Sequence, residues 1–342
     1  MKAAFLYTSA LLAGFTACSG VTQQSERQYA AYTLRPETAV VSGYTAIGGS
    51  SDRTRLFGVT AKNELYELND DLSRGQFVNY PAAQTDRISS LMMSGGRLYV
   101  GSWSDANGKN VVFSLDADGT GKTVQIGNGS YSYTHDAANG SGPWHPQHVY
   151  AGTAYVYVAA TGQNVRVYRL ADMLAADWKN TAEPFCYLKL NFSVGKGNRI
   201  SMQERNGDIF ISSDSADGVC RFNTGTFRRG TAAQAAAPEQ TVSRPIRGQR
   251  VRAFTFGKTK AAAAAGSAVY IYELPDFLSY SFDAPLIVLS APDGQPFDKI
   301  RGLYGLTEDA GVISFTVQAD WGIVRYAAAA YPVTERTAGV TR

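Results

Sequence analysis

The sequence predicts an all-β protein built as a single β-propeller of four-stranded blades, and three observations support this prediction. The 342 residues include 20 Tyr, 16 Phe and 34 Gly but only 5 Met, a composition that favours pleated sheets and tight turns over helical bundles. Short alternating runs that end in an aromatic residue recur about every 52 residues along the chain. Most of them follow another strand-like run and a turn cluster, which indicates repeated hairpins.

The repeats can be followed in order by the aromatic residue that ends each alternating run. These anchors are Tyr66, Phe113, Tyr168, Phe222, Tyr272 and Tyr326. A further apolar run often follows an anchor, as at residues 76–80 and 184–190, which gives about four strands per repeat. The fifth repeat is irregular, because residues 261–265 are all alanine where a strand is expected, and alanine has a poor β propensity.

The number of blades is left open by the repeat. Six copies can be counted, and residues 21–54 and 327–342 remain outside them. These two segments could together form a seventh blade closed by strands from both termini, or could supply only the closing strand of the sixth. Either arrangement makes residues 20–342 one propeller domain.

The N-terminus has the pattern of a secretory signal peptide that ends near residue 19. Residues 1–20 carry one positive charge, an apolar run over residues 3–17 and small residues after it. The run is too short to span a bilayer, and no later stretch is long enough, so we expect a secreted, extracellular protein without a transmembrane segment. The alternative is a bacterial lipoprotein of the periplasm or outer membrane, in which Cys18 would be acylated.

Two features depend on export. Cys186 and Cys220 remain after cleavage and could form one disulfide in an oxidising compartment or stay as two small buried side chains. Three N-x-S/T sequons, at Asn128, Asn139 and Asn191, predict a glycoprotein if the host is a eukaryote.

The charge distribution argues for a small anionic ligand rather than nucleic acid. The formal net charge is only +3, but nine Lys or Arg residues and one acid, Glu239, lie between Arg221 and Lys260. This basic stretch could attract polycarboxylates, sugar phosphates or acidic polysaccharide, or form a solvated loop. It lacks interleaved stacking aromatics, so nucleic acid is not expected as a partner.

All three histidines, His135, His145 and His148, lie within a segment rich in Gly, Asn, Ser and Pro that precedes the third repeat. We expect a loop there, and loops on rigid scaffolds often carry function. Three imidazoles could hold Zn²⁺, but Pro146 breaks the helix that would align two of them. A ligand-contacting or catalytic role for one histidine and a purely structural role both remain open, and no metal or cofactor is expected.

The histidine segment and the repeat after it carry a resemblance to a known family. GPWHPQHVYAGTAYVYVAATGQNVRVYRL, from residue 142, and GNRISMQERNGDIFISSDSADGVCRF, from residue 197, resemble the lactonase-type propellers, which include 6-phosphogluconolactonase and carboxymuconate cyclase. RLYVGSW and TVQADWGIVRY resemble neighbouring blades, so the likeness extends over about residues 55–326. It implies seven blades, and lactone hydrolysis or the reverse cyclisation, an isomerase reaction, on a small anionic substrate.

By position, the resemblance implies catalytic roles for His148, Arg199 and Asp214. A histidine can move a proton near neutral pH, an arginine can clamp a carboxylate, and Asp214 would orient one of them. Asp214 stands where the family has Glu, and residues 261–265 replace a family arginine, for which Arg252 is the nearest candidate. The alternative function is a non-catalytic propeller that binds carbohydrate, an anion or a protein partner at the same channel mouth.

Overall fold

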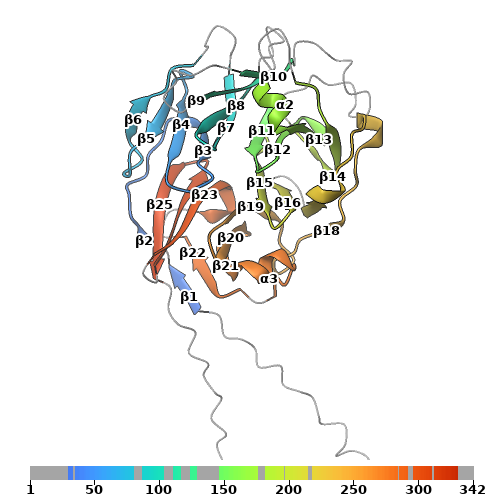
Figure 1. Cartoon of the computed structure of the whole chain (residues 1–342). Coiled ribbons are helices and arrows are strands. Elements are labelled where there is room, and N and C mark those ends of the chain that lie inside the picture. Colours follow the sequence, from blue (N-terminus) through green and yellow to red (C-terminus); the bar gives the residue numbers. More distant parts are fainter. Residues whose placement is uncertain are drawn as a thin grey trace, which may run out of the picture.

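The computed structural model describes residues 30–33, 35–80, 87–103, 111–116, 124–128, 146–175, 182–195, 197–214, 218–283, 285–291, 296–309 and 312–329. They form six sheets, antiparallel except for one added edge strand, arranged around a common centre (Figure 1). The first strand of each sheet packs beside the first strand of the next, and the last sheet returns to the first, so the sheets are the blades of a closed β-propeller.

Each of the first three blades is a four-stranded meander that starts at the centre and ends at the rim. Their strands are, in chain order, β3 (Tyr44–Gly49), β4 (Leu56–Thr60), β5 (Leu65–Leu68) and β6 (Arg74–Phe77); β7 (Arg87–Ser94), β8 (Arg97–Trp103), β9 (Val111–Asp116) and β10 (Val124–Asn128); and β11 (Pro146–Ala151), β12 (Tyr155–Ala160), β13 (Gly162–Arg169) and β14 (Cys186–Val194). A short helix, α2 (Leu170–Ala175), follows β13.

The last three blades follow the same plan. Their strands are β15 (Ile200–Arg205), β16 (Asp208–Ser213), β17 (Val219–Asn223) and β18 (Gln240–Val242); β19 (Val251–Phe256), β20 (Lys260–Ala265), β21 (Ala268–Glu273) and β22 (Ile287–Ser290); and β23 (Ile300–Asp309), β24 (Val312–Ala319) and β25 (Gly322–Ala329). Helix α3 (Leu274–Leu278) follows β21, and three short 3-10 turns lie at Thr224–Thr226, Ala232–Gln234 and Phe297–Lys299.

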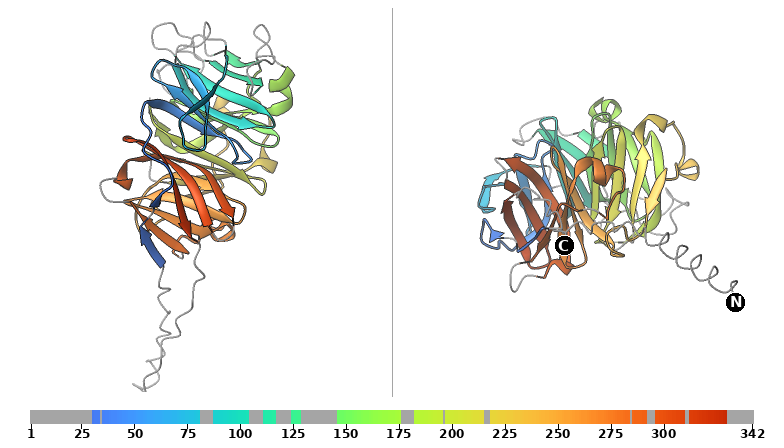
Figure 2. Two further views of the ribbon diagram at one scale, coloured as in Figure 1. Left: turned by 90° about the vertical axis from the view of Figure 1, so that its left-hand side faces the viewer. Right: turned by 90° about the horizontal axis from the view of Figure 1, so that it is seen from below.

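The propeller has six blades, so the seven-bladed prediction is wrong. The N-terminal residues add edge strands to existing blades instead of forming a new sheet. Strand β2 (Arg35–Pro36) pairs antiparallel with β25 as the fourth strand of the sixth blade, and β1 (Ala30–Thr33) pairs parallel with β22 outside the fifth (Figure 2). Pairing N-terminal strands onto the last two blades closes the ring and covers their open edges.

The aromatic repeat is confirmed, because all six anchors lie on the third strand of a blade. Five of them, all except the partly exposed Tyr66, have at most 1% of their surface exposed to solvent. A large ring on the third strand fills the space between one blade and its neighbour, where the flat faces of twisted sheets leave the widest gap. The sequence period is therefore the period of inter-blade packing.

The alanine run forms a strand, contrary to the expectation from β propensity. Residues 261–265 lie in β20 and are buried between β19 and β21. Large rings surround them, with Phe254 and Phe277 at 5.6 Å between ring centroids. The short methyl groups leave room for these rings, so tertiary packing outweighs the intrinsic preference of alanine.

Cys186 and Cys220 are buried free thiols and are not joined by a disulfide. The Cys220 thiol donates to Oδ1 of Asn191, at 2.8 Å, so this sequon side chain forms a hydrogen bond with β17 of the next blade. Asn139 and the predicted signal segment lie outside the described residues, and export stays a prediction. Within the described ranges, no helix has the length and apolar character needed to cross a membrane.

Candidate functional site

The six inner strands enclose a central channel of about 160 Å³, which is the candidate site. Each of the strands β3, β7, β11, β15, β19 and β23 contributes lining residues. All blades have the same strand order, so the inner strands all run in the same direction and begin at the same opening. We call this opening the strand-start mouth and the opposite one the strand-end mouth.

A repeated irregularity shapes the strand-start mouth. Near their first residues, five of the six inner strands have one residue more than the strand beside them, which is a β-bulge. A bulge re-aims a side chain and takes its backbone groups out of the ladder. The extra residues are Thr45, Ser89, Gln147, Arg252 and Arg301.

Arg199 precedes the inner strand of the fourth blade and crosses the channel. Its Nη2 donates to the carbonyl oxygen of Thr45 at 2.6 Å, and its Nη1 donates to that of Ser89 at 3.2 Å. Both acceptors belong to bulged residues, so the guanidinium satisfies carbonyls that the bulges take out of the sheet. Arg199 thereby ties the fourth blade to the first and second. Its Nε is buried and has no hydrogen-bond partner within the described part of the chain.

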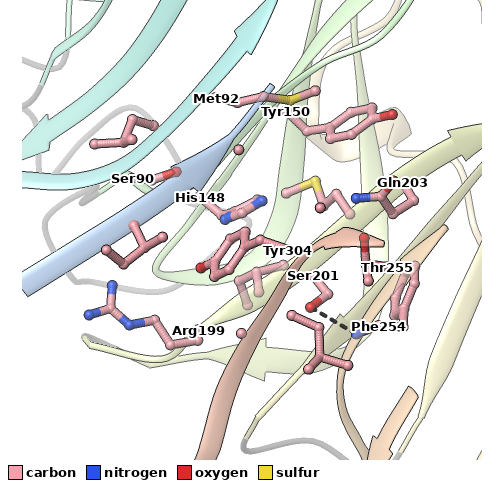
Figure 3. Close-up of a pocket in the computed structure, with 18 of the residues that line it drawn as sticks. Ser90, Met92, His148, Tyr150, Arg199, Ser201, Gln203, Phe254, Thr255 and Tyr304 are labelled. Carbon is pink, nitrogen blue, oxygen red and sulfur yellow. Dashed lines mark hydrogen bonds between the residues drawn. The ribbon is translucent and has the colours of Figure 1, made fainter. Parts of the chain in front are cut away.

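His148 lies on β11, so the histidine segment is strand and not loop at this position. Its side chain points into the channel in the same region as Arg199 (Figure 3). Burial, together with the charge of Arg199, lowers the pKa of His148 to about 4. The imidazole is therefore neutral at pH 7, and among the described residues none forms a hydrogen bond with it. His135 and His145 lie outside the described ranges.

Asp214 does not line the channel, and it supports the arginines rather than His148. It follows β16 and faces Arg199, whose backbone N–H donates to Oδ1 of Asp214 at 3.1 Å while the Asp214 N–H donates to the Arg199 carbonyl at 3.0 Å. Its Oδ2 accepts from Nη1 of Arg301 at 3.2 Å. Burial raises the pKa of Asp214, against the lowering effect of the nearby arginines.

Arg252 is the bulged residue of β19 and lies outside the channel lining, although its charge is close enough to lower the pKa of Asp214. Of the other basic residues in this stretch, Arg244, Arg247 and Arg250 precede β19 and Lys260 pairs with Glu273 at 2.6 Å. Within the basic stretch, Arg252 therefore lies on an inner strand, whereas Lys260 forms an ion pair within the fifth blade.

Arg301 is a site residue that the sequence analysis missed. It lines the channel and forms ion pairs with both Asp320 and Asp214. A signal was present, because four of the six inner strands have an arginine at their first residue or directly beside it. These arginines are Arg87, Arg199, Arg252 and Arg301. Two acids lie among them, Asp214 and Asp320, so the described residues of the strand-start mouth include more arginines than acids paired with them.

The strand-end mouth has a different character. Glu204 lines the channel there, accepts a hydrogen bond from the Tyr157 hydroxyl at 3.1 Å, and donates through its backbone N–H to the Tyr150 hydroxyl at 2.9 Å. Burial raises the pKa of its carboxyl. Arg53 spans this opening and donates to the carbonyl of Phe256 at 3.3 Å. These contacts join the third blade to the fourth and the first blade to the fifth.

No metal centre is formed by the described residues, since no three His, Cys, Asp or Glu side chains among them are grouped closely enough to hold an ion. Comparison with protein-family models and with curated proteins gives no match to this chain. The functional assignment therefore depends on the chemistry of the channel itself.

Proposed function

We propose that this propeller binds a small carboxylate-bearing ligand in its channel, at the strand-start end. The observation that carries the proposal is the gathering of four arginines at or beside the starts of the inner strands, of which Arg199 and Arg301 line the channel. Among the described residues, Asp214 and Asp320 form ion pairs with Arg301. Clefts lined by one sign of charge with low-dielectric walls concentrate counter-ions. Arg199 supports the same conclusion, because its guanidinium crosses the channel and places a buried positive charge there that an anion would compensate.

Calorimetric titration with mono-, di- and tricarboxylates and with inorganic phosphate tests this proposal. We expect at least one carboxylate to bind and its affinity to fall as NaCl is raised, because salt screens the arginines. Arg252→Gln removes one partly exposed charge and should weaken binding about fivefold.

Arg228→Gln is the matched control. Arg228 donates to the carbonyls of Gly225 and Phe227 in the connection between β17 and β18, away from the inner strands. Its loss should leave the affinity unchanged. Absence of binding for every probe, or equal losses in Arg252→Gln and Arg228→Gln, would contradict the proposal.

Lactone hydrolysis, or the reverse cyclisation, is the second candidate function. It is favoured by the neutral ring of His148, which is in the protonation state of a general base and faces the same channel. In hydrolysis, His148 would take a proton from water as the hydroxide adds to the lactone carbonyl; the ring C–O bond then breaks, and the imidazolium of His148 gives this proton to the leaving oxygen. Arg199 would hold the carboxylate of the substrate.

A panel of lactones separates the two functions. If the chain is a lactonase, His148→Ala should lower the rate about 100-fold or more, in the range typical of a lost general base. Equal rates for the wild type and His148→Ala would leave binding as the function. Tyr272→Phe, which removes a buried hydroxyl outside the channel lining, is the control for nonspecific damage.

A further inference from the structure

Tyr304 is a channel residue with an unusual setting on the inner strand of the sixth blade. Between the pairs Tyr304–Thr316 and Thr307–Ser314, β23 has one residue more than β24, so a second bulge directly follows Tyr304. Gly305, in this bulge, has φ +62°, which is the left-handed region that glycine adopts without strain. The bulge turns the strand and directs the Tyr304 side chain into the channel.

The direction of the ring is fixed by a glycine on the same strand. A Cβ placed on Gly302 would lie 2.5 Å from the Tyr304 hydroxyl oxygen, so only glycine leaves room for the hydroxyl there. Since Gly302 is nearer than Tyr304 to the start of β23, the ring folds back toward the strand-start mouth. Figure 3 shows Tyr304, His148 and Arg199 pointing into the same region of the channel.

The hydroxyl group remains a proton donor at all physiological pH values. Burial raises the pKa of Tyr304 to about 12, although the nearby charge of Arg199 opposes the shift. The hydroxyl donates to Oε1 of Gln318, at 2.9 Å, on β24. An amide can present either its oxygen or its NH₂ group. If the Gln318 amide turns over, its NH₂ donates to the tyrosine oxygen and the tyrosine proton becomes available to a ligand.

We propose that Tyr304 is a ligand-binding residue that forms the floor of the carboxylate site and donates its hydroxyl proton to the bound carboxylate. The inference rests on the proposed function. The Tyr304 hydroxyl would then donate to the carboxylate close to the positive charge of Arg199, which lines the same channel. Gln318 acts as the exchange partner that holds the tyrosine proton when no ligand is bound.

The test is calorimetric titration of Tyr304→Phe with the carboxylate that binds the wild type. Loss of a hydrogen bond to a charged group should weaken binding about tenfold or more. Gln318→Leu removes the competing acceptor at similar volume, and should bind the carboxylate at least as tightly as the wild type. Tyr272→Phe, on the third strand of the fifth blade and outside the channel lining, removes a buried hydroxyl that donates to the carbonyl of Phe282, and should leave the affinity unchanged.

The outcomes separate this inference from the function on which it rests. If the wild type binds no carboxylate, the proposed function fails and the role of Tyr304 fails with it. If the wild type binds and Tyr304→Phe binds equally well, only the role of Tyr304 is overturned. A loss in Gln318→Leu as large as that in Tyr304→Phe would also overturn it, because a donor freed by the substitution should not weaken binding.

Discussion

Replacing Arg199 with leucine is expected to lower the free energy of unfolding by about 3 kcal/mol, the largest effect of any single substitution considered. The substitution removes two hydrogen bonds from a charged donor and leaves the carbonyls of Thr45 and Ser89 without partners inside the channel. Leucine also removes a desolvated charge, which offsets part of the loss. The net change in the free energy of unfolding is a loss, because the two unsatisfied carbonyls lie at bulges and cannot form hydrogen bonds with the adjacent strand of their own sheet instead.

Urea unfolding measures this effect, with two matched variants. Arg199→Lys retains the charge but cannot bridge two carbonyls with a planar fork, so it should recover only part of the stability. Arg252→Leu removes a comparable arginine from the same mouth, one with no hydrogen bond to the opposite blades, and should change stability by less than about 1 kcal/mol. A loss below that level in Arg199→Leu would show that the arginine does not brace the channel.

The second large effect concerns the pH dependence of ligand binding. His148 is neutral in the free protein because burial and Arg199 hold its pKa near 4. A bound carboxylate favours the imidazolium form and so raises this pKa. Affinity should therefore rise as the pH falls, by up to about tenfold per pH unit between the pKa values of the bound and free states. Calorimetric titrations between pH 5 and pH 8 would measure the slope.

His148→Gln is the control for this dependence. Asp214 lies beside the same arginines, and a bound carboxylate would raise its pKa because the two negative charges repel, so its protonation adds a slope of the same sign. The contribution of Asp214 to the pH dependence of affinity should persist in His148→Gln, whereas the steeper contribution of His148 should disappear. Identical slopes in the two proteins would exclude His148 from the ligand site.

The sequence predicted the propeller because its signal is local. An aromatic residue on the third strand of each blade packs against the next blade, so the spacing of Tyr66, Phe113 and their successors repeats the geometry of the ring. The blade number was not predictable in the same way. Pairing of β2 with β25 joins residues at opposite ends of the chain, and no periodic pattern marks a two-residue strand.

The alanine strand shows how packing can reverse a local preference. The propensity of residues 261–265 argues against a strand, but their small side chains are what the crowded rings of Phe254 and Phe277 require. Nothing within the run reveals these rings, which come from a neighbouring strand and a helix. Only the assembled blade decides its structure.

The site residues were predictable in part. His148 and Arg199 do line one channel, whereas Asp214 and Arg252 lie beside it. Arg301 was missed although arginine recurs at the starts of four inner strands, because this repeat becomes visible only when the bulges are known. Tyr304 had no sequence signal beyond the flanking glycines, since its role depends on a bulge and on the missing side chain of Gly302.

The most direct test of the carboxylate site is the pKa of His148 with and without ligand. The chain has three histidines, so the Cε1 signals of ¹³C-histidine-labelled protein can be followed by NMR against pH, and His148→Gln identifies the relevant signal. We expect a pKa of about 4 in the free protein and a higher value when a carboxylate saturates the channel. A pKa that does not change with saturating carboxylate would contradict the placement of an anion beside His148.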